Sequence, residues 1–273
     1  MFTCKILADS LNLVNDRLTT FEITLPRIIL AEFNTHRMLS RNSASSRAIP
    51  VEKMMKRVVE DPFFPVYWGK NQKGMQATQE LTPGEIVEAK QEWLRARDFA
   101  LSQAKKLLDL GVHKQITNRI IEPWMWHTVI TSATEWQNFF NLRTHKDAQP
   151  EIQVIAEMMK EAYDVSLPRV LQVGEWHLPL IDWDDVIEGE ISDAEFPEVS
   201  AGKCARVSYL THDGKRDPKA DLDLCRKLIE AGHMSPMEHA AVALATSERL
   251  GNFTGFKQYR KFIENEDIYR QKV

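Results

Sequence analysis

Apolar residues recur at helical spacing in several parts of the chain. The longest such pattern runs from Ile86 to Leu108, where apolar residues return every three or four positions, and Gly111 follows it as a C-cap would. Each pattern gives a helix with one apolar face, so we expect these helices to pack on a common core. Shorter helices are predicted from about His113 to the residue before Pro123, through Trp136 to Leu142, from Pro150 onward and over Pro218–Ala231.

The alternation that marks a half-buried strand is weaker along this chain. Thr20–Leu25 alternates polar and apolar residues, and Pro26 then stands where the first turn of a helix tolerates it. Ala205–Tyr209 is a second, shorter candidate strand. Ala240–Ala245 is too short and too rich in small residues to assign to a helix or a strand.

One acidic stretch interrupts these patterns. From Leu178 to Gly202 the chain has eight acidic residues, two prolines and two glycines, and it has no lysine or arginine. Such a composition is typical of a linker or a surface excursion. We therefore predict a single domain over residues 1–273, with residues 178–202 joining its central and C-terminal parts.

The densest polar segment lies between Asn34 and Pro50, directly after the helix that Pro26 opens. Its seventeen residues include three arginines, one histidine, four serines and two asparagines, but no acid. Many hydrogen-bond donors in a positive field suit phosphate. Because the whole chain has a formal net charge of -4, the positive charge is local, and it favours a small anionic ligand over a nucleic-acid polymer.

The composition also indicates the size of the core and the cellular compartment. With 273 residues, of which 43% are apolar, the chain can bury a large core. The three cysteines, Cys4, Cys204 and Cys225, are far apart without metal-binding spacing, so we expect buried thiols in a reducing compartment. We find no signal-peptide pattern and no apolar run of the roughly 20 residues that a membrane span needs, so we expect a cytoplasmic protein with no membrane partner.

Three groups of residues resemble the motifs of flavin-dependent thymidylate synthases. The first motif comprises His36, Arg37, Ser40, Asn42, Ser45 and Arg47, and the second is Asn138–Arg143 with Gln149 and Glu151 after it. The third motif is Ala205–Tyr209 together with Gly232–His239. The family usually has the third motif near its N-terminus, so the chain resembles a member with rearranged motif order.

The resemblance implies an α+β fold in which helices pack on a mainly antiparallel sheet. It implies conversion of deoxyuridylate (dUMP) to thymidylate (dTMP), with methylenetetrahydrofolate as carbon donor and reduced FAD as hydride source. NADPH is the implied reductant, and the implied assembly is a homotetramer with sites shared between subunits. Sharing makes the rearranged order easier to accept, because distant segments can still meet in one pocket.

The resemblance also assigns roles to individual residues. Arg143 is placed against the pyrimidine, where a guanidinium can stabilise charge that develops at N3 and a carbonyl oxygen. The phosphate-binding residues are Ser45, Arg47 and Arg119. The flavin contacts are His36, Arg37 and Asn138, and a second set that touches flavin or folate is His233, Ser235 and Glu238. We predict no metal site, because Glu238 and His239 are adjacent and no third ligand is spaced near them.

More ordinary interpretations exist for several of these residues. Arg143 and Arg119 are also explained as solvated or salt-bridged surface charges, and His233 as a residue that caps the helix ending at Gly232. An aromatic group around the motifs is better explained as core than as cofactor stacking. It comprises Trp124, Trp126, Trp136, Phe139 and Phe140.

The chain departs from the family pattern at four positions near the expected ligands. Thr35 replaces an arginine, Ser43 replaces an acid, Glu32 replaces a glutamine and Asp147 replaces a histidine. An added acid near the pyrimidine changes which donors and acceptors are accepted, so the sequence also allows deoxycytidylate (dCMP) as the substrate. A hydroxymethyl product and a catalytically silent nucleotide-binding protein are compatible with the sequence as well.

Overall fold

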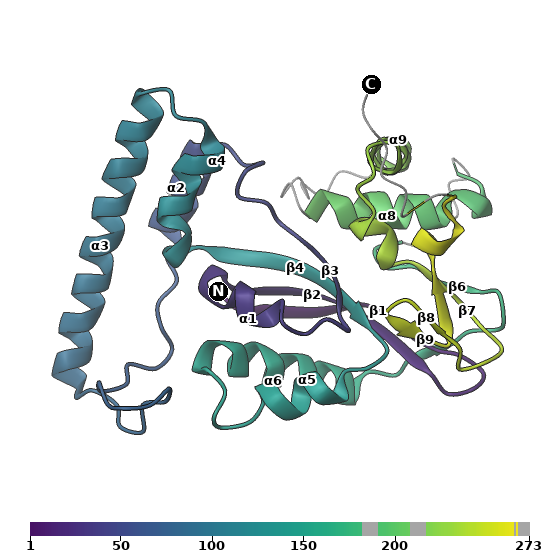
Figure 1. The fold of residues 1–273 in the computed structure, drawn as a ribbon, viewed down its shortest axis with the longest axis horizontal. Coiled ribbons are helices and arrows are strands. Elements are labelled where there is room, and N and C mark those ends of the chain that lie inside the picture. Colours follow the sequence, from purple (N-terminus) through teal and green to yellow (C-terminus); the bar gives the residue numbers. More distant parts are fainter. Residues whose placement is uncertain (182–190, 208–216, 265, 267–273) are drawn as a thin grey trace.

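The computed structural model describes residues 1–181, 191–207, 217–264 and 266. A five-stranded sheet runs through the middle of the molecule in the order β3-β4-β2-β1-β5 (Figure 1). All neighbours are antiparallel except β1 and β5, so the expected mainly antiparallel α+β fold is confirmed. The strands are β1 (Thr3–Leu11), β2 (Arg17–Pro26), β3 (Ser40–Ser43), β4 (Trp126–Ala133) and β5 (Arg169–Val170).

Helices cover both faces of this sheet. On one face lie α5 (Gln137–Arg143) and α6 (Pro150–Val165), and on the other lie α8 (Phe196–Val207) and α9 (Pro218–Glu230) (Figure 1). The strand predicted at Thr20–Leu25 is part of the central strand β2, where most residues are buried and not merely half-buried. The largest core cluster joins β2 to α5 and α6 and includes Phe21, Ile23, Leu25, Trp136, Phe139, Phe140, Ile152 and Ile155.

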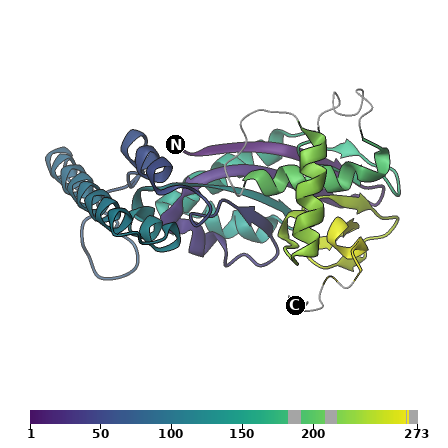
Figure 2. The same cartoon turned by 90° about the horizontal axis from the view of Figure 1, so that it is seen from above.

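A helical extension occupies one end of the molecule (Figure 2). It consists of α2 (Val51–Glu60), which was not predicted, and the long helix α3 (Pro83–Asp109), which the pattern from Ile86 to Leu108 predicted. Thr82 and Glu85 form a capping box at the start of α3, and Gly111 adopts the positive φ of 78° that ends it. The helix predicted before Pro123 is only α4 (Lys114–Thr117), and a 3-10 helix, η2 (Asn118–Trp124), continues through that proline.

Short elements form the other end of the molecule. A three-stranded sheet pairs β6 (Trp176–His177) and β10 (Phe256–Gln258) with β7 (Ala241–Ala243), so Ala240–Ala245 contains a strand. The same end holds β8 (Arg249–Leu250) and β9 (Phe253–Thr254). Short helices complete the fold, namely η1 (Arg27–Ile29), α1 (Leu30–Phe33), η3 (Asp193–Glu195), η4 (Ser235–Glu238) and η5 (Tyr259–Phe262).

The structure corrects two predictions around α8. The predicted acidic linker over 178–202 is wrong for its last part, because Phe196–Gly202 lies in α8 and most of it is buried. The predicted strand Ala205–Tyr209 is also wrong for Ala205–Val207, which ends the same helix, while residues 208–209 lie outside the described residues. Most positions of α8 are apolar or small and buried, and its acid Glu198, with 20% of its side chain exposed, pairs with Arg226 of α9 at 2.7 Å.

Candidate active site

The polar segment enters the sheet as its edge strand. Its residues Ser40–Ser43 form β3 and pair with β4, and the amide of Ala44 continues the pairing by donating to the Thr128 carbonyl at 3.1 Å. Beyond Ser43 the chain leaves the strand and turns at residues 46–48. Ser43, Ser45 and Arg47 line one cavity, whereas Ala44 and Ser46 line another.

The cavity beside Ser45 and Arg47 has a volume of about 500 Å³. Its facing wall carries His233 and Ser235 from the third motif. The first and third motifs therefore meet across one cavity, although Asn42 and Ser235 are 193 positions apart in the chain. The remaining wall is formed by Gln115, Ala205, Leu228 and Pro236.

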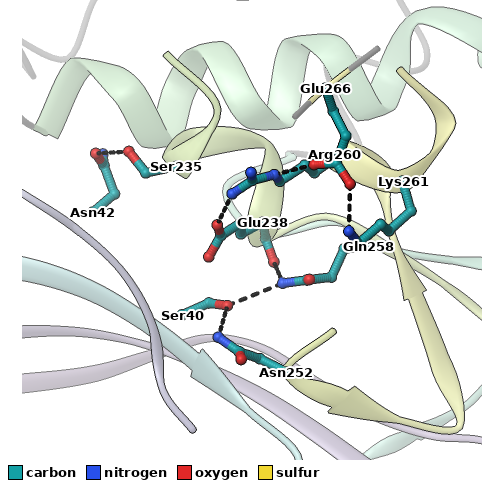
Figure 3. A network of polar contacts seen from close by, with 9 residues as sticks. All are labelled: Ser40, Asn42, Ser235, Glu238, Asn252, Gln258, Arg260, Lys261 and Glu266. Carbon is teal, nitrogen blue, oxygen red and sulfur yellow. Dashed lines mark hydrogen bonds and ion pairs between the residues drawn. The ribbon is translucent and has the colours of Figure 1, made fainter. Parts of the chain in front are cut away.

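A polar network fastens the third motif to the polar segment (Figure 3). The Ser235 hydroxyl lies 3.5 Å from Asn42 Oδ1, and Asn42 Nδ2 donates to the Cys204 carbonyl at 2.8 Å. Gln258 Nε2 bridges the two chain segments, because it donates to Ser40 Oγ at 2.9 Å and to the Glu238 carbonyl at 3.0 Å. These contacts fix the position of the wall that carries Ser235.

The Glu238 side chain takes part in the same network. Its Oε1 pairs with Arg260 at 2.7 Å, and Arg260 and Lys261 both pair with Glu266 (Figure 3). Glu238 is therefore held by the C-terminal part of the chain, beneath the wall that carries Ser235.

Arg143 lies in a second group, at the end of α5 and against the turn that follows α1. Its Nε donates to His36 Nε2 at 2.8 Å, and one terminal nitrogen donates to Thr35 Oγ1 at 3.3 Å. The other terminal nitrogen is 3.8 Å from a carboxylate oxygen of Glu32. Two of the four departures from the family pattern, Glu32 and Thr35, thus converge on the arginine assigned to the pyrimidine.

His36 is held in its neutral form in this group. Burial, followed by the charges of Arg143 and Arg41, lowers the pKa of His36 from 6.5 to about 4. Since Nε2 accepts the Arg143 hydrogen bond, the neutral ring carries its proton on Nδ1. The ring also packs edge-on against Phe139 at a centroid distance of 5.0 Å, which fixes its plane.

Arg119 lies in a third place, on η2. It pairs with Glu122 at 2.7 Å, and the same carboxylate oxygen accepts from Ser46 at 2.9 Å and lies 3.5 Å from Arg27. Arg27, Arg119 and Glu122 line a cavity of about 480 Å³ that shares no lining residue with the cavity beside Ser45. Two guanidinium groups against one carboxylate leave net positive charge there.

The structure thus separates the predicted residues of one chain. Ser45, Arg47, His233 and Ser235 share a cavity, whereas Arg143 with His36 and Arg119 lie elsewhere. Arg37 and Asn138 are exposed. Four members of the aromatic group are core, as predicted, because Trp124, Trp136, Phe139 and Phe140 are at most 6% exposed, whereas Trp126 is only partly buried.

A buried chain of polar groups near the site was missed by the sequence analysis. Ser10 contacts His177 Nδ1 at 2.8 Å, and Thr20 contacts His177 Nε2 at 2.8 Å. Ser132 continues the chain, contacting Thr20 at 2.6 Å and His239 Nδ1 at 2.9 Å. The position of His239 directly after Glu238 was the one signal in the sequence, since His177 lies in no motif.

A family model described as thymidylate synthase complementing protein matches residues 17–169, more than half of the chain. The chain belongs to this family. The matched range contains the first two motifs, and the third lies outside it. No curated protein matches the chain.

One solved structure shares the fold of this chain at a TM-score of 0.50, and two others align with lower scores. A crystal structure of the UMP/dUMP methylase PolB from Streptomyces cacaoi bound with 5-Br UMP superposes with a TM-score of 0.50 and 17% identity, covering 60% of this chain and 88% of that chain. PolB bound with 5-Br dUMP gives a TM-score of 0.45 at 20% identity over 54% and 66% of the two chains. Thymidylate Synthase X from Helicobacter pylori with FAD and dUMP gives 0.38 at 21% identity over 54% and 67%.

Proposed function

We propose that the protein is a flavin-dependent thymidylate synthase that converts dUMP to dTMP, with methylenetetrahydrofolate as carbon donor and NADPH as reductant. The observation that carries this proposal is the cavity in which the first and third motifs face each other despite their reversed order. If the motif matches were accidental, there would be no reason for the first and third motifs to line the same cavity. Folding has brought together Ser45, Arg47, His233 and Ser235, which the family resemblance assigned to substrate and cofactor.

The residues around this cavity fit FAD, whose pyrophosphate needs donors and positive charge. The polar segment supplies hydroxyl and guanidinium donors without an acid, and the facing wall supplies an imidazole and a hydroxyl. Reduced FAD supplies the hydride when it is bound. Direct contacts are assigned to His233 and Ser235 at this cavity and to His36, Arg37 and Asn138, which do not line it in one chain. Glu238, paired with Arg260, holds the wall in place.

The substrate phosphate is assigned to Arg47, Ser45 and Arg119. These residues line two different cavities of one chain. The homotetramer that the family resemblance implies would allow two subunits to bring them together around one phosphate.

Arg143 is assigned to the pyrimidine ring. An arginine has five N–H donors, and its contacts with His36 and Thr35 use two of them. The remaining donors can stabilise charge that develops on a ring carbonyl when C5 becomes nucleophilic. Neutral His36 sets the plane of the guanidinium without adding a charge of its own.

The cysteines do not favour the other route to thymidylate, in which a thiolate adds to C6. Burial raises the pKa of Cys4 and Cys225 to about 12, and it raises the pKa of Cys204 further. A nucleophilic cysteine needs a lowered pKa. None of the three thiols supplies a thiolate at neutral pH, which supports the flavin route.

Absorption spectroscopy and product analysis test the proposal together. The protein, purified and incubated with FAD, is expected to show a flavin band that changes when dUMP is added and to form dTMP with both co-substrates. Arg143→Ala is expected to lose product formation by roughly a hundredfold or more while keeping the flavin band. The exposed Arg95→Ala on α3 serves as the control, because its partner is Glu92 on the same helix.

The outcomes separate the classes of function. Flavin binding without product from any nucleotide would support the catalytically silent nucleotide-binding protein. Full activity in Arg143→Ala would remove this residue from the mechanism, and no flavin band under any condition would contradict the flavoenzyme.

Glu32 motivates a second candidate, a hydroxymethylase or methylase acting on dUMP or dCMP. Its carboxylate, with 40% of its side chain exposed, lies 3.8 Å from the guanidinium assigned to the ring. A carboxylate accepts a hydrogen bond from the exocyclic amino group of cytosine, whereas uracil presents a carbonyl oxygen there. Product analysis with both nucleotides is expected to show a preference for dCMP that Glu32→Gln reverses. Equal preference in wild type and variant would contradict this candidate.

A further inference from the structure

The cavity beside Arg119 contains a second arginine, Arg27, to which the family resemblance assigns no role. Arg27 begins η1, and its backbone amide donates at 2.8 Å to the carbonyl of Met125, the residue that follows η2. This contact fixes the start of η1 against the end of η2, the helix that carries Arg119. Two short helices therefore place two guanidinium groups in one cavity of about 480 Å³.

One carboxylate oxygen holds the two guanidinium groups near each other. Glu122 Oε1 accepts from Arg119 Nη1 at 2.7 Å and lies 3.5 Å from Arg27 Nη2. Because both nitrogens approach the same oxygen, they lie close together despite their like charges. Ser46 Oγ also donates to this oxygen, at 2.9 Å, and so helps to fix its position.

Most donors of the two arginines are unused. An arginine has five N–H donors on its side chain, and Arg27 and Arg119 each direct one of them toward Glu122. Their side chains have no other partner among the residues that the structure describes. The Arg119 side chain is 45% exposed and that of Arg27 is 19% exposed, so a ligand in the cavity can reach both.

The charge and shape of the cavity suit a phosphate group. Glu122 neutralises only one of the two positive charges, so the cavity attracts an anion. The three terminal oxygens of a phosphomonoester can accept from two guanidinium forks, whereas a planar carboxylate is matched by one. Ile28, Ala31 and Pro123 provide apolar surface beside the arginines, where a sugar can pack.

We propose that Arg27 is a further binding residue for the 5′-phosphate of the nucleotide and contacts it together with Arg119. This inference rests on the proposed function for the identity of the nucleotide. The phosphate accepts from donors that the two arginines do not direct toward Glu122, so the carboxylate can stay in place while the phosphate is bound.

A nucleotide and its nucleoside provide matched probes, because dUMP and deoxyuridine differ only in the phosphate. In calorimetry, Arg27→Met is expected to weaken dUMP binding roughly tenfold to a hundredfold, the effect of lost charge-assisted hydrogen bonds, and to leave deoxyuridine binding unchanged. Arg27→Lys keeps the charge without the fork, so its loss should be smaller. Arg95→Met, which changes an arginine paired with Glu92 within α3, should alter neither affinity.

Inorganic phosphate tests the role of Arg27 in the unaltered protein, so the test stands even where Arg27→Met folds poorly. In protein with 15N-labelled arginine, millimolar phosphate is expected to shift the Nε–H signals of Arg27 and Arg119. Arg226, which is paired with Glu195 and Glu198, should keep its signal unchanged.

The phosphate titration also separates this inference from the proposed function, because it needs no flavin, folate or turnover. A protein that forms no dTMP would contradict the proposed function, while the Arg27 signal would still decide whether Arg27 binds phosphate.

Three results would overturn the inference about Arg27. The first is an Arg27 signal that does not move at millimolar phosphate. The second is a dUMP affinity of Arg27→Met equal to that of the wild type. The third is equal weakening of dUMP and deoxyuridine in this variant, because Arg27 would then support the fold of the cavity without contacting the phosphate.

Discussion

At the residue scale, Arg143 illustrates what a motif reveals and what it leaves out. The Asn-Leu-Arg context was enough to single this residue out of the sequence. Its contacts with Glu32 and Thr35 were not predictable, because they depend on how the turn after α1 approaches the end of α5. Glu32 and Thr35, which looked like independent departures from the family pattern, therefore both contact the guanidinium of Arg143.

His36 gives a prediction about positioning. His36→Phe keeps an aromatic ring against Phe139 but removes the acceptor for Arg143 Nε. We expect thymidylate formation to fall by roughly tenfold to a hundredfold, because a misplaced catalytic group loses most of its effect. The free energy of unfolding should change by only about 1 kcal/mol, the worth of one hydrogen bond.

Steady-state kinetics and urea unfolding of His36→Phe and of the exposed His145→Phe check this expectation. An unchanged turnover in His36→Phe would show that Arg143 needs no support from the imidazole.

The buried histidines give a prediction about pH. Burial lowers the pKa of His127, His177 and His239 from 6.5 to about 3. In the unfolded chain they take up protons below about pH 6.5, whereas the folded protein keeps them neutral until about pH 3. Their contribution to stability is therefore fully present above pH 6.5 and is lost as the pH falls toward 3.

The three protons that these residues take up on unfolding correspond to a loss of about 4 kcal/mol per pH unit around pH 5, and His36, whose pKa is lowered to about 4, adds to this slope. Urea unfolding between pH 7 and pH 4.5 measures this slope. His177→Gln, which keeps hydrogen-bonding groups between Ser10 and Thr20, should lower the slope by about one proton. A slope identical to that of the wild type would show that His177 does not titrate on unfolding.

At the scale of elements, helices were predictable where period and end signals agreed. The helices α3, α6 and α9 begin at or next to prolines, and glycines with positive φ follow α3 and α9. Strands β1 and β4 were missed because their exposure does not alternate, and β4 is almost fully buried along its length. Helix α8 was missed because the segment was judged by its average charge.

Helices α8 and α9 pack so closely at Gly202 that the position has no room for a larger side chain. A Cβ at Gly202 would lie 2.1 Å from the backbone oxygen of Asp221, closer than any real contact, whereas a Cβ at Gly84 meets nothing within 4 Å. We expect Gly202→Ala to destabilise the protein by roughly 1–3 kcal/mol or more, since the two helices must move apart. Gly84→Ala should stabilise it slightly, by about 0.5–1 kcal/mol, because it lies in a helix.

Thermal unfolding of both glycine variants measures the difference. Equal melting temperatures for the two would contradict the close approach of α8 and α9.

At the scale of the whole molecule, the reversed order of the motifs was visible in the sequence. How the separated motifs come together in space was not. Sequence placed the third motif far from the first. Only tertiary contacts such as Gln258 with Ser40 and Ser235 with Asn42 show that the two share a cavity (Figure 3). These long-range contacts depend on how β7, β10 and α8 pack together. No short sequence pattern predicts that packing.

The proposed sharing of sites, with Arg47 and Arg119 of one phosphate site coming from two subunits, predicts complementation between subunits. Arg47→Ala and Arg119→Ala are each expected to be nearly inactive alone. When the two variants are co-expressed and form mixed tetramers, random assembly should return roughly a quarter of the wild-type rate, because some sites receive both arginines. Mass measurement in solution checks the tetramer, and a co-expressed sample no more active than either variant would contradict shared sites.

The network that fastens the third motif to the polar segment also determines the order in which the cavity walls form during translation. The strands β1–β4 and the polar segment emerge from the ribosome long before Ser235, Gln258 and Arg260, which complete the opposite wall. A nascent chain can therefore bury much of its sheet while its cavity is still open on one side. Folding of the segment from Ser235 to Arg260, and not formation of the sheet, is the step after which a bound ligand can be enclosed. Products that end before Ser235 should be folded in part but unable to retain a ligand.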